Sequence, residues 1–228
     1  MKLRKLSISD YFLILANLIP VYGVWFEGWS AAQVFLVYCL ETVIIGLFNV
    51  VKMACVTLFV KPKDVWSTKG GITLVGGLFF IVFFIVHYGF FVLIQTQIFF
   101  GVSGLIKDNS MFGSYSQIPA ALGNDGKLLL LIFITYYTLH TLYNFFLSGA
   151  YKTISMGKLM FQPYGRIFVQ QFVVIVGSMF LAMGFTDIFI LILVLVKIGF
   201  ELFINFDALI DKSEAEAKKK MEESGNKI

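Results

Sequence analysis

The sequence predicts an all-α, polytopic membrane protein with six transmembrane helices and with both the N and the C terminus in the cytoplasm. Composition is the first indication: 58% of its 228 residues are hydrophobic and 14% are charged, whereas a soluble domain is about 45–50% apolar and about 25% charged. Long apolar runs are the second, because a helix needs about 20 apolar residues to cross a bilayer. The third is an alternation of basic and non-basic loops between these runs, as the positive-inside rule requires.

Six apolar segments have the length expected of membrane spans. Proline inside the first of them, Pro20, is expected to kink or interrupt that helix, because its ring removes a backbone N–H. The basic tract KLMFQPYGR, at residues 158–166, comes before the fifth segment and is expected to lie along the membrane surface. The spans are predicted at residues 10–26, 31–60, 72–99, 128–148, 166–183 and 188–209.

These spans form one predicted domain over residues 1–210, followed by a charged cytoplasmic tail over residues 211–228. Basic residues gather in the N-terminal arm, in the loops after the second and fourth spans, and in the tail, while the third loop holds only Lys107, with Lys127 at its end. Six spans keep this alternation and seven would break it. The predicted location is the plasma membrane, the inner membrane of the cell.

The predicted partner is the lipid bilayer, and the sequence leaves open whether the chain forms a homo-oligomer. Its formal net charge is +4, and the basic residues lie where membrane topology places them. No nucleic acid is therefore needed to explain the charge.

Residues 31–60 carry three polar side chains within an otherwise apolar run: Glu41, Asn49 and Lys52. Their spacings of eight and three place them on one stripe of a helix. A carboxylate in hydrocarbon costs several kcal/mol unless it faces protein, water or a partner. Glu41 is therefore expected to face other helices, whereas Lys52 lies near the helix end and can extend toward the headgroups.

Other predicted spans supply polar groups at helical spacings, with His87 followed by Gln95, His140 by Asn144, and Lys197 by Glu201 and Asn205. Each set lies on one helix face, as a shared cavity requires. Glu201 can neutralise Lys197 one turn away, and Glu41 can pair with Lys197 from another helix or with a histidine. The predicted site is a polar funnel, hydrated toward the cytoplasm and closed toward the outside, and consists of Glu41, Asn49, His87, His140, Asn144, Lys197, Glu201 and Asn205.

Three classes of function fit such an interior. The leading one is transport or conduction of a proton, an ion or a small polar solute, because histidine titrates near neutral pH and a Lys–Glu pair can exchange partners. The second is an intramembrane metal- or haem-dependent enzyme with His87, His140 and Glu41 as metal ligands, although no HExxH or Glu-x-x-His motif is present. The third is a structural subunit whose interhelical hydrogen bonds are worth about 0.6–2 kcal/mol each. The sequence identifies neither a substrate nor a cofactor.

Five tracts spread over most of the chain carry a resemblance to known proteins. They are ANLIPVYGVWFEGWS at residues 16–30, ETVIIGLFNVVKM at 41–53, FFIVHYGFF at 83–91, QPYGRI at 162–167, and the helix around Lys197. In these tracts the chain resembles a family of bacterial and archaeal integral membrane proteins that is catalogued only as a domain of unknown function. The resemblance implies a fold and a membrane location, and it implies no activity.

Overall fold

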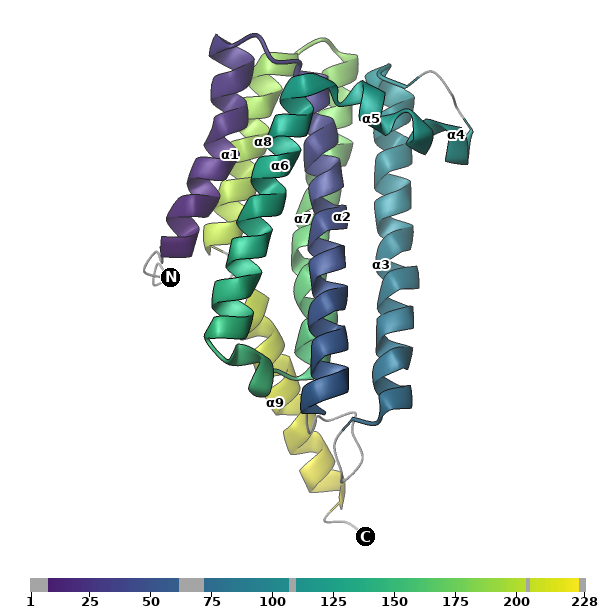
Figure 1. Ribbon diagram of the computed structural model, residues 1–228, viewed down its shortest axis with the longest axis vertical. Helices are drawn as coiled ribbons and strands as arrows, with labels where there is room; N and C mark the ends of the chain where they lie inside the picture. The colour runs from purple at the N-terminus through teal and green to yellow at the C-terminus, as the bar shows by residue number, and fades with distance from the viewer. Residues whose placement is uncertain (1–7, 62–71, 107–109, 204–205, 226–228) are drawn as a thin grey trace.

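The computed structural model describes residues 8–61, 72–106, 110–203 and 206–225, except for some side chains within these ranges. The described residues form a bundle of helices and contain no β-strand, which confirms the predicted all-α class. The helices that run along the length of the bundle in Figure 1 are α1 (Ile8–Phe26), α2 (Ala31–Cys55), α3 (Leu74–Ser103), α6 (Gly123–Thr141), α7 (Met156–Ala182) and α8 (Thr186–Phe203).

Four segments in the described part of the chain are long and apolar enough to cross a membrane: Ala31–Val60, Leu74–Ser103, Gly123–Leu147 and Met156–Gly177. A shorter apolar segment, Ile14–Phe26, lies in α1. Large apolar side chains on the outer face of the bundle, such as Phe79, Val82 and Val86 of α3, are exposed as lipid-facing residues are. The chain is therefore a helical membrane protein.

Two of these segments end in π-helical turns, η1 (Val56–Val60) after α2 and η2 (Leu142–Leu147) after α6. A π turn holds one residue more than an α turn, so it rotates the side chains that follow it relative to those before it. Shorter helices complete the chain: α4 (Met111–Ser116) and α5 (Ile118–Ala121) before α6, and η3 (Ala150–Lys152) before α7.

The sequence suggested that residues 158–166 lie along the membrane surface as a segment of their own. The structure instead includes them in α7, which begins at Met156 and continues through Pro163. A proline inside a helix leaves the carbonyl four residues earlier without its N–H donor. Here that carbonyl belongs to Leu159, and it accepts a hydrogen bond of 2.9 Å from Nδ2 of Asn49 on α2. A neighbouring helix thus replaces the missing donor, which lets the helix continue.

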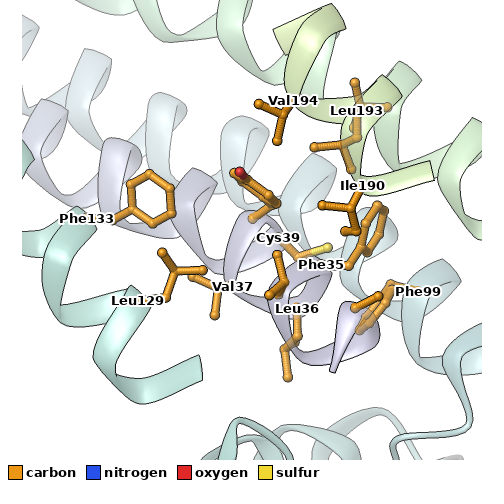
Figure 2. Packing of buried hydrophobic residues seen from close by; sticks show 14 of the residues in the cluster. Phe35, Leu36, Val37, Cys39, Phe99, Leu129, Phe133, Ile190, Leu193 and Val194 are labelled. Carbon is orange, nitrogen blue, oxygen red and sulfur yellow. The ribbon is translucent and has the colours of Figure 1, made fainter. Parts of the chain in front are cut away.

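Helix α2 lies at the centre of the bundle and packs against α3, α6, α7 and α8. Figure 2 shows how its N-terminal half fills the apolar core at one end. In that view Phe35, Leu36, Val37 and Cys39 of α2 lie among residues of three other helices, namely Phe99 of α3, Leu129 and Phe133 of α6, and Ile190, Leu193 and Val194 of α8. A second apolar cluster, which includes Met53, Phe84 and Leu159, lies toward the other end of α2.

The charged helix α9 (Phe206–Gly225) leads away from the bundle at the end opposite the α1–α2 turn (Figure 1). Polar contacts between described residues join it to the start of α7. Nζ of Lys158 lies 2.6 Å from a carboxylate oxygen of Asp211, and the Ser155 hydroxyl donates a hydrogen bond of 2.6 Å to Glu214. Part of the charged C-terminal segment therefore contacts the bundle.

Candidate functional site

A buried ion pair joins α2 and α8. Nζ of Lys197 donates to Oε2 of Glu41, and the two residues are only 3% and 1% exposed. The hydroxyl of Tyr137 on α6 donates to the other carboxylate oxygen, Oε1, over 2.6 Å. Of the partners that the sequence left open for Glu41, the structure selects Lys197, and three titratable side chains from three helices meet in the bundle interior.

Aromatic rings surround the ammonium group of Lys197. Its Nζ lies 4.5 Å from the ring centroid of Tyr38 on α2 and 5.2 Å from that of Phe133 on α6. A cation over a desolvated ring face gains about 2 kcal/mol or more. The Tyr38 hydroxyl in turn donates to the backbone carbonyl of Asn17 on α1 over 3.4 Å, so it orients the ring from the other side.

A pocket of about 70 Å³ lies on the other side of Tyr137, between α2, α6 and α7. One water needs about 10–15 Å³ by this measure, so the pocket has room for more than one water. Its polar lining consists of Asn49, Lys52, Tyr137, His140, Thr141 and Gln162, and its apolar lining of Ile45, Phe48 and Pro163. Because Tyr137 belongs to both, the pocket and the ion pair are neighbours.

The structure does not bring His87 into this interior. His87 is exposed on α3, where its ring stacks on Phe83 and its Nδ1 lies 2.8 Å from the Tyr164 hydroxyl. The buried stripe of α3 runs through Tyr88 instead, and one residue turns a helix by about 100°. Gln95, predicted to share a face with His87, is fully buried. His87 and Gln95 are eight residues apart, so their side chains differ in direction by about 80° around the helix axis. The face that α3 buries is too narrow to include both.

Asn144 also lies away from the pocket. It follows His140 by four residues, which would place both on one face of a regular α-helix. The π turns of η2 intervene, and the structure leaves Asn144 exposed while His140 is half-buried in the pocket lining. Glu201 lies in α8 but its side chain is outside the described part of the structure, and Asn205 is outside the described residues.

The predicted metal ligands are not gathered at one point. Glu41 lies in the ion pair, His140 lines the pocket, and His87 contacts Tyr164 on the outer side of α3. Among the described residues, no group of three or more His, Cys, Asp or Glu side chains is arranged to hold a metal ion. The metal- or haem-dependent enzyme therefore stays a prediction, and no ligand cluster in the described part of the chain supports it.

Sequence reasoning missed two contributors to the site. Tyr137 completes the hydrogen bonding of Glu41, and Lys52, which the sequence assigned to the headgroup region, is half-buried and lines the pocket. A signal for Tyr137 was present, because Tyr137, His140 and Thr141 follow spacings of three and four and so share one helix face. For Lys52 the signal was its shared stripe with Asn49.

Comparison with known proteins gives the family of the chain and no further relative. No curated protein matches it, and no solved structure matches it. One family model, described as a family of unknown function (DUF6498), matches residues 1–224. Because this match covers nearly the whole helical bundle and its charged helix, the chain belongs to that family of unknown function.

Proposed function

We propose that this protein moves protons across the membrane and that Glu41 is the group that takes up and releases the proton. The observation that carries the proposal is the contact of three titratable side chains, Glu41, Lys197 and Tyr137, in the bundle interior. Ionisable groups at such positions in membrane proteins commonly belong to ion pathways or proton relays.

The energetics of a buried ion pair favour a functional role over a purely stabilising one. Removing two charges from water costs several kcal/mol per ion, and their mutual attraction often only offsets that cost. In soluble proteins, apolar residues of the same volume often replace such a pair without loss of stability. Glu41 and Lys197 therefore call for another explanation, and reversible protonation of the carboxylate supplies one.

Protonation of Glu41 removes the counter-charge of Lys197, so a transport cycle needs another environment for the ammonium group. The rings of Tyr38 and Phe133 supply one, because both already lie within about 6 Å of Nζ, the range of cation–π attraction. The proton can thus leave and return without moving Lys197 into hydrocarbon.

Access to Glu41 is unequal from the two sides, as a proton transporter at rest requires. The pocket begins at Tyr137, which contacts Glu41, and extends toward the Lys52 end of α2. On the other side the apolar core around Phe35, Leu36 and Leu129 closes the bundle (Figure 2). In the proposed topology, six spans that include α1 and α8 place both termini and the pocket side in the cytoplasm, with the protein in the plasma (inner) membrane.

A purely structural role is the second candidate, and two contacts favour it for part of the polar interior. Asn49 donates to the carbonyl of Leu159, and Gln171 of α7 donates to the carbonyl of Phe91 on α3, each over 2.9 Å. Such amide–carbonyl bonds fix helix packing and need no titratable group. They account for Asn49 and Gln171, and they leave the ion pair unexplained.

Proton flux into liposomes tests the proposal. Purified full-length protein is reconstituted around a pH-sensitive dye, a pH gradient is imposed, and the membrane potential is clamped with potassium and valinomycin. The wild-type protein is expected to dissipate the gradient faster than empty liposomes, and Glu41→Gln is expected to remove that excess rate. Glu216→Gln makes the same chemical change at an exposed position of α9 and should leave the rate unchanged. Equal rates in wild type, Glu41→Gln and empty liposomes would refute the proposal.

A further inference from the structure

His87 is a polar side chain on the outer, lipid-facing surface of the bundle. It lies close to the middle of the 30-residue helix α3, and thus near the middle of the bilayer when α3 crosses the membrane. The side chain is exposed, and the headgroups are about 15 Å away, beyond the reach of an imidazole. Histidines at this depth almost always face protein, water or another polar group. A polar partner from outside the bundle is therefore expected to cover it.

One ring nitrogen of His87 is left for that partner. Nδ1 lies 2.8 Å from the Tyr164 hydroxyl of α7. Phe83 stacks on the ring at 5.3 Å between centroids, and Phe91 lies 5.2 Å away in an edge-to-face arrangement. Nε2 has no hydrogen-bonding partner among the described residues. Whichever neutral tautomer is present, Nε2 is a donor or an acceptor, and hydrocarbon satisfies neither.

Three large apolar side chains continue the line of His87 along α3. Phe83, Phe90 and Ile94 are 41%, 60% and 40% exposed. Together with His87 they follow spacings of four, three and four, the pattern of a helix that packs along its length against another helix. Helix α3 stands at the edge of the bundle in Figure 1, so this line of four residues, the α3 seam, is open to a neighbour.

A second copy of this chain has the chemistry and the geometry that the α3 seam needs. Copies inserted in the same orientation form a closed dimer about a two-fold axis perpendicular to the membrane. A residue at that axis meets its own counterpart at the same depth. A neutral imidazole is self-complementary, because Nε2–H of one ring can donate to Nε2 of the other. The Tyr164 hydroxyl can donate to Nδ1 or accept from it, so it suits both tautomers.

We propose that this protein forms a parallel homodimer through the α3 seam, with His87 hydrogen-bonded to the partner's His87 at the two-fold axis. The hydrogen bond supplies what the apolar seam residues lack, because lipid tails solvate Phe and Ile as well as another helix does. A left-handed crossing of about 20° fits the seam spacing. Because the ion pair of Glu41 lies on α2 and α8, the dimer does not depend on the proposed function.

Cysteine cross-linking in membranes tests this arrangement, because only residues beside a two-fold axis come within disulfide distance of their own counterparts. The background is Cys39→Ala, Cys55→Ala, which removes both native cysteines. After oxidation of membranes that contain the full-length protein with iodine, His87→Cys and Phe90→Cys are each expected to give a covalent dimer. Phe90→Cys keeps His87, so it tests the seam even where His87→Cys does not fold.

Val82→Cys is the matched control. Val82 is 58% exposed on the same helix, but it is five residues from His87 and therefore points about 140° away around the helix axis. It is expected to give no covalent dimer. Equal cross-linking at positions 82, 87 and 90 would show random collision and would overturn the proposal. Absence of a covalent dimer from both seam variants would overturn it as well.

Dilution in liposomes measures the contribution of the imidazole. Energy transfer between two dye-labelled populations of the full-length protein reports the dimer as the protein-to-lipid ratio falls. His87→Leu is expected to weaken dimerisation about three- to thirtyfold, as loss of one interhelical hydrogen bond predicts. His87→Gln, which keeps a donor and an acceptor, should retain most of the affinity, and Val82→Leu should retain all of it.

Two results would overturn the role of His87. One is a His87→Leu variant that dimerises as tightly as the wild type. The other is a monomeric wild type that copurifies with a lipid-soluble small molecule, detected by mass spectrometry, which His87→Leu loses. That result would assign the exposed ring nitrogen to a ligand of the lipid phase.

Discussion

Asn49 of α2 donates its amide hydrogen to the carbonyl of Leu159 of α7, 110 residues later in the chain, over 2.9 Å. Leu159 stands four residues before Pro163, so its carbonyl lacks the helical donor that any other residue type would supply at position 163. A side chain of α2 therefore completes the backbone hydrogen bonding of α7 beside the pocket that Asn49 and Pro163 line.

This relationship predicts coupling between positions 49 and 163. Asn49→Leu leaves the buried Leu159 carbonyl unsatisfied, and it is expected to lower the free energy of unfolding by about 1–3 kcal/mol. In a Pro163→Ala background the alanine N–H can bond to Leu159, so the same change should cost less. Denaturant titration of the four proteins in detergent micelles, followed by circular dichroism, measures the cycle. Additive losses would mean that the Asn49 amide does not replace the missing donor.

The ion pair predicts a second cycle. Lys197→Met leaves Glu41 as an uncompensated buried charge and is expected to cost about 3–5 kcal/mol at neutral pH. Glu41→Gln leaves Lys197 beside the rings of Tyr38 and Phe133, so it is expected to cost less. The double variant should cost much less than the sum of the two single losses. Micelle titrations of the two single variants and the double variant give the coupling energy. If the losses of the two single variants add up to the loss of the double variant, the pairing of Glu41 with Lys197 is contradicted.

Tyr137→Phe tests the third member of the cluster. The change removes the hydroxyl that donates to Oε1 of Glu41 and keeps the ring, so it is expected to cost about 1.5–3 kcal/mol, the range for a hydrogen bond to a charged group. Proton flux in liposomes should fall as well. Tyr143→Phe is the control, because Tyr143 is exposed on η2. Equal losses from both variants would show that the bond to Glu41 contributes nothing specific.

The α2–α3 contact depends on a glycine. A Cβ at position 46 would lie 2.7 Å from Cε1 of Tyr88, a buried ring whose hydroxyl donates to the Thr42 carbonyl over 2.9 Å. Gly46→Ala is therefore expected to cost about 1–3 kcal/mol through overpacking.

Gly89→Ala is the matched control, since a Cβ at position 89 meets open space. It should be neutral or slightly stabilising, because alanine favours a helix over glycine by about 1 kcal/mol. Thermal unfolding in detergent compares the two variants. Equal midpoints would show that α3 shifts to accept the methyl group at no cost.

The proposed topology predicts which loops face the outside. In a Cys39→Ala, Cys55→Ala background, Ser30→Cys lies in the turn before α2 and should react with an impermeant maleimide added to intact cells. Lys152→Cys, in η3 before α7, should react only after the cells are opened. Labelling of both positions in intact cells would contradict six spans with cytoplasmic termini.

Several features could be predicted from the sequence because they depend on local composition and spacing. Apolar runs of more than 20 residues, at 31–60, 72–99 and 128–148, predicted three of the four described helices that have the length and hydropathy of membrane spans. The fourth, Met156–Gly177, begins ten residues before its predicted start at residue 166. The polar stripe on residues 31–60 predicted that Glu41 and Asn49 face the interior, and both are buried. A carboxylate in such a run is expected to face the inside of a bundle, because exposure to hydrocarbon costs several kcal/mol.

Other features depended on how helices rotate against one another, which no local pattern records. His87 lies one residue from the buried Tyr88, and the narrow contact of α3 with its neighbours decides that the histidine stays outside. The π turns of η2 separate Asn144 from His140, although their spacing matches an α-helix.

By itself the sequence determined that this chain is a helical membrane protein with charged groups in its interior, because hydrophobicity and helical period are properties of consecutive residues. Only the tertiary structure decided that Glu41 pairs with Lys197 and bonds to Tyr137. The physical reason is that a contact across 156 residues depends on the rotation and separation of packed helices, which close contacts such as that of Gly46 with Tyr88 determine.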